Sequence, residues 1–130
     1  MKTSKPAVYD TRFFSQLYRI NDDQERKRIR AEMTRKEKYV SPVVIHELYY
    51  SSIANEGREI AKTKVAYVKQ DFKIIPVDAF IGEISAELRH KYRIPMGDSM
   101  IAATAVMLKS VCITDDQHIR QIKEIETAWI

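Results

Sequence analysis

Cysteine, glycine and long apolar runs are all scarce in this 130-residue chain. Cys112 is the only cysteine, which excludes an intrachain disulfide and a cysteine-based zinc cluster and leads us to expect a reducing, cytoplasmic setting. The three glycines form no phosphate-cradling loop. The uncharged run over residues 99–108 is far shorter than the ~20 residues that span a bilayer, and the N-terminus lacks the apolar stretch of a secretion signal. We therefore expect no membrane association.

The residues that are present describe a compact protein. Hydrophobic residues make up 45% of the chain and charged residues 31%, a globular composition, and the length suits one domain over residues 1–130. The formal net charge is +4 at pH 7. A positive surface attracts polyanions, so the charge permits a nucleic-acid partner without proving one.

Short apolar segments alternate with helical patterns along the chain. Strands are predicted at residues 6–10, 39–40, 73–77 and 111–114, and helices over residues 11–20, 21–38, from 42 onward, 58–72, 79–92, 98–109 and 115–122, with a terminal strand or tail at 127–130. Asp78 is well placed to cap the helix over 79–92. This alternation predicts an α/β fold with a central parallel sheet of four to five short strands flanked by helices, in which chemistry occurs at the carboxyl ends of the strands.

Four carboxylates lie in or beside apolar segments that normally exclude charge: Asp10, Glu47, Asp98 and Asp116. Each aspartate, taken alone, also fits a helix cap. Glu47 does not, because it lies inside a helix on the same face as Val43 and Tyr50. A buried ion pair with a Lys or Arg is the structural alternative for Glu47.

Acids that converge without cysteine or histidine partners suit Mg²⁺ or Mn²⁺ and do not suit zinc. Hydrolysis of a phosphodiester bond uses such cations to bind the scissile phosphate, activate water and stabilise the leaving oxygen. Crowded acids also raise one another's pKa unless a cation compensates. The four acids thus predict a metal-dependent nuclease site.

The order of the motifs resembles a known family. Asp10-Thr11 after a strand, Ser41-Pro-Val-Val-Ile-His-Glu47-Leu, Asp98-Ser-Met-Ile-Ala-Ala-Thr-Ala and Thr114-Asp-Asp116-Gln-His118 are similar to the successive motifs of PIN domains, most closely those of VapC-type toxin ribonucleases of VapBC toxin–antitoxin pairs. Any one motif is weak, whereas four in order over nearly the whole chain are fairly specific.

The resemblance implies a Rossmann-like PIN fold and Mg²⁺- or Mn²⁺-dependent cleavage of RNA. It matches Asp10, Glu47 and Asp98 to the family's metal-site acids and Asp116 to the fourth acid, with Thr11 and Thr114 at accompanying hydroxyl positions. It also implies a homodimer and an antitoxin protein that occludes the acidic crevice.

Several residues of these motifs keep alternative interpretations. Asp115 adjoins Asp116 and competes with it for the inward position. Arg12 replaces a residue that is often small in the family, and it fits either a phosphate contact or a pair with a local acid. His118 is interpreted as a surface or packing residue, Ile119 as a packing substitution for phenylalanine, and His46 as pointing about 100° away from Glu47.

Other features have structural interpretations. The basic residues at 26–30 fit a solvated helix face better than an RNA contact, and Tyr49 and Tyr50 fit core or dimer packing better than base stacking. A PIN-fold module that binds RNA or protein with little catalysis is the alternative function. An aspartate-based phosphatase is less favoured, because it leaves Glu47 unexplained and lacks a second aspartate two residues after Asp10.

Overall fold

A five-stranded, all-parallel sheet forms the centre of the computed structural model, which describes residues 5–19 and 22–130. Its strand order is β3-β2-β1-β4-β5, formed by Ala7–Tyr9 (β1), Lys38–Val40 (β2), Lys73–Ile74 (β3), Val111–Ile113 (β4) and Thr127–Ala128 (β5). β1 lies in the middle, where Val8 pairs in register with Tyr39 of β2 and Cys112 of β4. The predicted α/β fold is thereby confirmed, with one more strand than the minimum expected.

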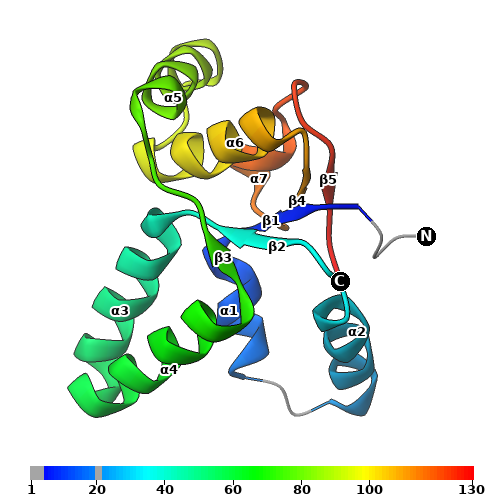
Figure 1. Ribbon diagram of the computed structural model, residues 1–130, viewed down its shortest axis with the longest axis vertical. Coiled ribbons are helices and arrows are strands. Elements are labelled where there is room, and N and C mark those ends of the chain that lie inside the picture. The colour runs from blue at the N-terminus through cyan, green and yellow to red at the C-terminus, as the bar shows by residue number, and fades with distance from the viewer. Residues whose placement is uncertain (1–4, 20–21) are drawn as a thin grey trace.

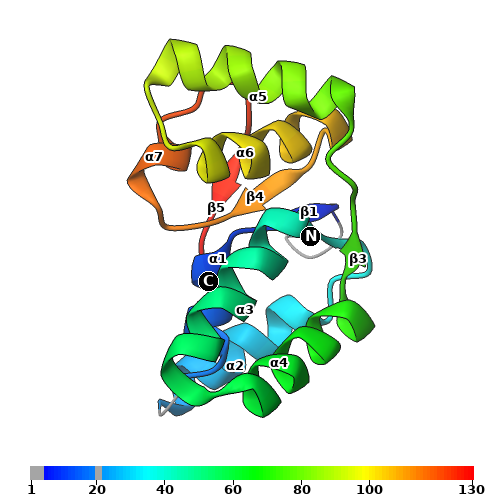
Figure 2. The same ribbon diagram turned by 90° about the vertical axis from the view of Figure 1, so that its left-hand side faces the viewer.

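Helices cover both faces of this sheet, and Figures 1 and 2 show α1–α4 on one side and α5–α7 on the other. Their bounds are Thr11–Leu17 (α1), Asp23–Met33 (α2), Pro42–Glu56 (α3), Arg58–Asp71 (α4), Ala79–Tyr92 (α5), Met96–Leu108 (α6) and Gln117–Arg120 (α7). Parallel strands need such crossover helices, which shield both faces from water. No helix in the described part of the chain is long and apolar enough to cross a membrane.

Local sequence accounts for several helix boundaries. Asp78 caps α5 by accepting a hydrogen bond from the Ile81 amide at 2.9 Å, as predicted. The Ser41 hydroxyl caps α3 through the Val43 amide, and Pro42 occupies the first helical position. α3 ends at Gly57, whose φ of 92° is accessible mainly to glycine.

Several predicted boundaries were wrong. α6 begins at Met96 instead of residue 98, because the extended Pro95 precedes the first turn. α7 covers only four residues, because the Asp116 side chain caps it and the helix starts after that cap. α1 and α2 end at Leu17 and Met33, before the expected 20 and 38. Ile20 and Asn21, which belonged to the predicted helices, lie outside the described residues.

The site at the carboxyl edge follows from the strand order. The chain builds outward from β1 to β2 and β3, then crosses back to form β4 on the other side of β1. The loops after β1 and β4 therefore leave in different directions and open a crevice between them. Asp10 follows β1 and Thr114 follows β4, so the fold brings two of the predicted motifs to this one position.

Candidate metal centre

Asp10 lies at the floor of the crevice. Its side chain is only 3% exposed, and both oxygens are hydrogen-bonded: Oδ1 accepts from the Thr11 amide and Oδ2 from the Thr114 hydroxyl, each at 2.7 Å. Asp10 is also the N-cap of α1. The cap interpretation and the site interpretation of this residue are thus compatible, because the cap fixes the carboxylate at the strand end.

Thr114 links Asp10 to the fourth acid. Its buried hydroxyl donates to Asp10 and accepts from the Asp116 amide at 3.0 Å. The Asp116 carboxylate in turn accepts from the His118 amide at 2.8 Å and caps α7. The Thr-x-Asp spacing therefore lets one hydroxyl hold the end of β1 and the loop after β4 together.

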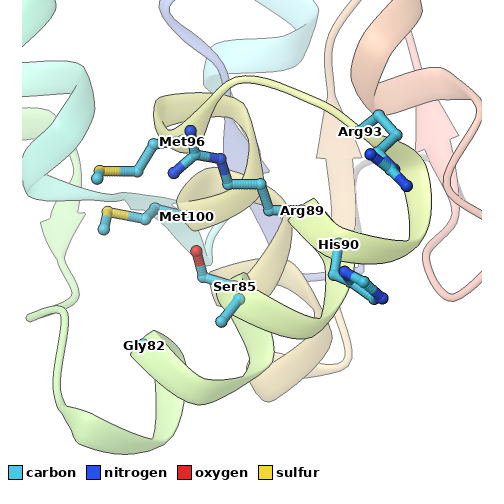
Figure 3. Close-up of a pocket in the computed structure, with 8 residues that line it drawn as sticks. Gly82, Ser85, Arg89, His90, Arg93, Met96 and Met100 are labelled. Atoms are coloured by element: carbon cyan, nitrogen blue, oxygen red, sulfur yellow. The ribbon is translucent and has the colours of Figure 1, made fainter.

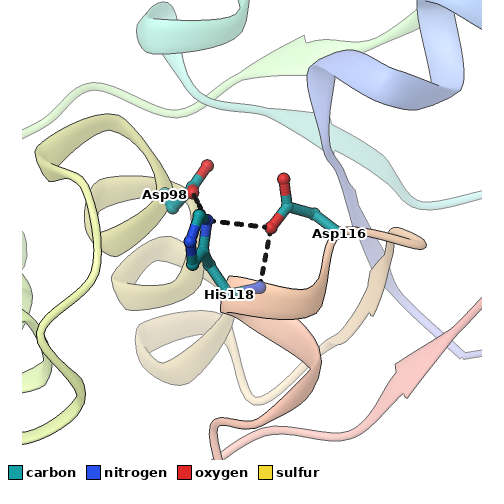
Figure 4. A group of neighbouring side chains, drawn as sticks. All are labelled: Asp98, Asp116 and His118. Carbon is teal, nitrogen blue, oxygen red and sulfur yellow. Dashed lines mark hydrogen bonds and ion pairs between the residues drawn. The ribbon is translucent and has the colours of Figure 1, made fainter.

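Asp98 and Asp116 face one another across the crevice, with the His118 ring between them (Figure 4). The His118 Nδ1 lies 3.2 Å from Asp98 Oδ2 and 3.3 Å from Asp116 Oδ1. One ligand atom from each of these three residues lies within 4.8 Å of the others. Asp98 is not a helix cap, because it lies inside the first turn of α6.

Glu47 approaches from α3, on the opposite wall. The Thr11 hydroxyl donates to Glu47 Oε1, and α6 passes so close that a Cβ on Gly97 would lie 3.5 Å from Glu47 Oε2. Glu47 therefore lies beside the turn that carries Asp98. No Lys or Arg in the described ranges forms an ion pair with Glu47, so the structure does not support the ion-pair alternative.

The carboxylates of this crevice affect one another's titration. The pKa of Asp10 is raised to about 6, mainly by burial; the hydrogen bonds from Thr114 and Thr11 oppose the rise, and the charges of Asp98 and Asp116 add to it. Burial also raises the pKa of Asp98, assisted by the charges of Asp116 and Glu47 and opposed by His118. The four predicted acids thus share one electrostatic environment.

Asp115 points away from this environment. Its carboxylate forms a two-point pair with the Arg12 guanidinium, through Nε and Nη2, and Arg12 holds the pKa of Asp115 below its usual range. Asp116 is consequently the inward acid of the two neighbours. Arg12, whose role the sequence left open, pairs with a local acid at the mouth of the crevice, where its side chain is 55% exposed.

The donor set fits a hard divalent cation. Asp98, Asp116 and His118 place their ligand atoms close enough together to share one ion. Asp10 and Glu47 are outside that close group and are linked to it through the charges that raise the pKa values of Asp10 and Asp98. Neighbouring carboxylates raise one another's pKa because their negative charges repel. A bound cation offsets this repulsion, because it stabilises the charged form of each acid. These five residues are therefore the ones that could hold Mg²⁺ or Mn²⁺.

His118, which the sequence pattern predicts to be a surface or packing residue, has its ring against two of the acids, Asp98 and Asp116. A usable signal was present: in an Asp-x-His sequence at a helix start, the cap bonds to the His amide and brings the two side chains together. Ile119 is fully buried, which agrees with its packing interpretation.

The remaining candidates lie away from the crevice. His46 is exposed and its ring stacks on Tyr50 at a centroid distance of 6.0 Å. Tyr49 packs against the core, whereas Tyr50 is 71% exposed. Of the predicted core or dimer packing, the core is thus excluded for Tyr50, and dimer packing stays a prediction. The basic residues at 26–30 form the predicted solvated face of α2, with only Ile29 buried.

Comparison with known proteins gives the family. The family model described as "PIN domain" matches residues 7–125. A search of curated protein sequences finds no match. Among solved structures, VapBC2 from Rickettsia felis bound to a promoter DNA fragment is similar, with a TM-score of 0.80, 17% identity and coverage of 95% of this chain and 98% of that one.

Two other solved structures are similar in fold. VapBC-5 from Mycobacterium tuberculosis, a member of the VapBC family of toxin–antitoxin systems, has a TM-score of 0.70 and 19% identity, and covers 97% of this chain and 99% of that one. FitAcB from Neisseria gonorrhoeae has a TM-score of 0.74 and 19% identity, with coverage of 93% and 95%. The family match spans almost the whole chain, and the sheet order and acidic crevice agree with it: this chain belongs to the PIN domain family.

Proposed function

We propose that this protein is a metal-dependent endoribonuclease that hydrolyses RNA phosphodiester bonds and acts as the toxin of a type II toxin–antitoxin pair. The observation that carries the proposal is the convergence of Asp10, Glu47, Asp98 and Asp116 on one crevice at the switch point of the sheet. These acids come from four separate segments of the chain. Packing alone gives no reason to bring four carboxylates together.

Asp10, Glu47, Asp98 and Asp116 would hold one or two Mg²⁺ or Mn²⁺ ions. When bound, such a cation offsets the phosphate charge and lowers the pKa of water, which makes water a nucleophile at neutral pH. The chain's own hydroxyls orient the acids: Thr114 holds Asp10, and Thr11 holds Glu47. Because these hydrogen bonds hold the carboxylates in place before a cation binds, binding does not have to pay the entropy of ordering their side chains.

The toxin assignment rests on the solved structures of similar fold. Several of these are toxin–antitoxin complexes, which supports an antitoxin protein as a partner of this chain and, within the same scheme, a homodimer. The net charge of +4 suits an RNA substrate, because polyphosphate chains are drawn to a positive surface. The family match supports nuclease chemistry in general, and RNA is the substrate that the toxin scheme requires.

Cleavage of RNA by the purified chain tests the proposal. We expect cleavage with Mn²⁺ or Mg²⁺ and none after chelation. Asp98→Asn keeps the shape of the side chain but removes its charge, so cleavage should fall at least about 100-fold.

Asp78→Asn provides the matched control. It makes the same chemical change at an exposed helix cap outside the crevice, where asparagine caps equally well, so its cleavage should equal that of the wild type. Equal cleavage by Asp98→Asn and wild type would refute the site assignment. Tight RNA binding without metal-dependent cleavage of any RNA would favour a PIN-fold binding module instead.

A further inference from the structure

A basic groove runs along α5 and the first turns of α6, outside the acidic crevice. It has a volume of about 500 Å³, within the range of natural ligand sites, and Arg89, His90 and Arg93 line it with Met96 and Met100 (Figure 3). Among the residues that the structure describes, no carboxylate lines this groove. Glu83 and Glu87, the acidic residues of α5, are exposed but are not part of its wall.

The cations of the groove lack acidic partners. Lys91, in the same last turn of α5, pairs with Glu124 at 3.1 Å, whereas Arg89 and Arg93 form no ion pair with any residue in the described ranges. Basic residues at a helix C-terminus stabilise its dipole. That effect explains the presence of Arg89 in the last turn and of Arg93 at the C-cap, but not why these two arginines line one groove and remain unpaired.

The groove and the crevice lie on two sides of one helical turn. Met96 borders the groove and Asp98 borders the crevice, and two residues of helix advance only about 3 Å along the axis. A buried hydrogen bond of 2.8 Å between the Ser85 and Ser99 hydroxyls fixes α5 against this turn. This contact connects the wall of the groove directly to the turn that carries Asp98.

Gly82 leaves the far end of the groove open. It is the fourth residue of α5, where alanine would give a more stable helix, and a Cβ added there would meet nothing within 4 Å. No packing within the chain requires glycine at this position. An open wall next to unpaired cations fits a site that receives something from outside the chain.

We propose that this groove binds the sugar–phosphate backbone of the RNA strand beyond the bond that is cut. Arg89 and Arg93 would contact phosphates through their forked guanidinium groups, and Met96 and Met100 would provide an adaptable apolar floor. The inference rests on the proposed ribonuclease function, because it extends the path of that substrate.

Anisotropy of a short fluorescent single-stranded RNA of mixed sequence tests the groove, with chelator present so that no cleavage occurs. The double variant Arg89→Ala/Arg93→Ala should weaken binding at least about tenfold. It should also reduce the slope of log K against log salt by roughly 1.4, or about 0.7 for each lost phosphate contact. Gly82→Leu, which fills the groove without changing charge, should also weaken binding.

The matched control is Arg28→Ala/Arg30→Ala, which removes the same charge from exposed positions on α2, at the other end of the molecule (Figure 1). It should change RNA binding less than about threefold. Thermal unfolding should show that all variants remain folded, since the substituted arginines are exposed.

Cleavage kinetics separate this inference from the proposed function. With Mn²⁺, the groove variant should raise KM at least about tenfold and leave kcat nearly unchanged. If the wild type binds RNA through the groove but does not cleave it, the proposed nuclease function is refuted and the proposed RNA-binding role of the groove is retained. If the Arg89→Ala/Arg93→Ala variant cleaves and binds RNA as the wild type does, RNA binding by the groove is refuted. It is also refuted if the variant loses self-association or partner binding while its RNA binding is unchanged.

Discussion

Asp10 is buried, and its burial makes the charged form of the carboxylate less favourable than it is in water. Its pKa is about 6 in the folded protein, against an ordinary value of 3.8. The pKa of Asp10 is higher in the folded protein than in the unfolded chain, so protonation of Asp10 favours the folded state. This contribution to the free energy of unfolding is fully present below pH 3.8 and is lost as the pH rises through 6. Ionised Asp10 therefore lowers the free energy of unfolding at pH 8 unless a cation is bound.

Asp10→Asn tests this at the residue scale. The amide is neutral at every pH, so the metal-free variant should be more stable than the wild type at pH 8, by up to about 3 kcal/mol, with the difference vanishing near pH 4. Urea unfolding with chelator present measures it. Added Mn²⁺ should stabilise the wild type more than the variant. A variant less stable than the wild type at pH 8 would contradict the account.

His118 gives a second prediction at this scale. Its ring contacts Asp98 and Asp116, so His118→Ala should weaken Mn²⁺ binding about 10- to 100-fold, as losses beside metal ligands commonly do. Calorimetric titration measures the affinity. His46→Ala removes an exposed imidazole from the outer surface of α3 and should leave the affinity unchanged. Equal affinities in the two variants would exclude His118 from the site.

At the scale of elements, α2 is attached to the sheet by buried charge. Arg35 is 3% exposed and donates from Nε to Glu32 Oε2 at 2.6 Å, while the Tyr9 hydroxyl of β1 donates to the same carboxylate. A further guanidinium nitrogen donates to the Lys5 carbonyl. These contacts fasten α2 to the central strand and to the segment before it.

Removal of one partner should destabilise the protein strongly. Arg35→Ala leaves Glu32 buried without its cation, so we expect a loss of about 3–5 kcal/mol in the free energy of unfolding. Glu32→Gln/Arg35→Met removes both charges and should recover most of it. Arg28→Ala, on the exposed face of α2, should cost less than about 0.5 kcal/mol. Urea unfolding measures the free energy of unfolding of the three variants. If Arg35→Ala lowers it only slightly, Glu32 is solvated and the account of a buried pair is wrong.

Sequence pattern predicted elements well where the signals were local. The helix over residues 79–92 matched at both ends, because Asp78 caps it and the Ile-Pro after Arg93 prevents its continuation. The Glu32–Arg35 pair escaped prediction, since its burial depends on Tyr9, 23 residues before Glu32 in the chain. Charged residues three apart on a helix give the same pattern whether exposed or buried.

At the scale of the whole molecule, the site arises from topology. Asp10, Glu47, Asp98 and Asp116 span more than a hundred residues of sequence, and only the crossover from β3 back to β4 brings them together. The sequence allowed these acids to be named from their apolar surroundings and motif order. It could not decide between Asp115 and Asp116, because that choice depends on where Arg12 of α1 lies.

Anomalous scattering from crystals soaked in Mn²⁺ tests the central claim, a shared metal site, most directly. We expect a manganese peak between Asp98 and Asp116, roughly 2.1–2.3 Å from an oxygen of each, with Asp10 and Glu47 bound directly or through one water. Asp115 should remain paired with Arg12. The absence of a peak between Asp98 and Asp116 under saturating Mn²⁺, or a peak bound by Asp115 instead, would contradict this claim.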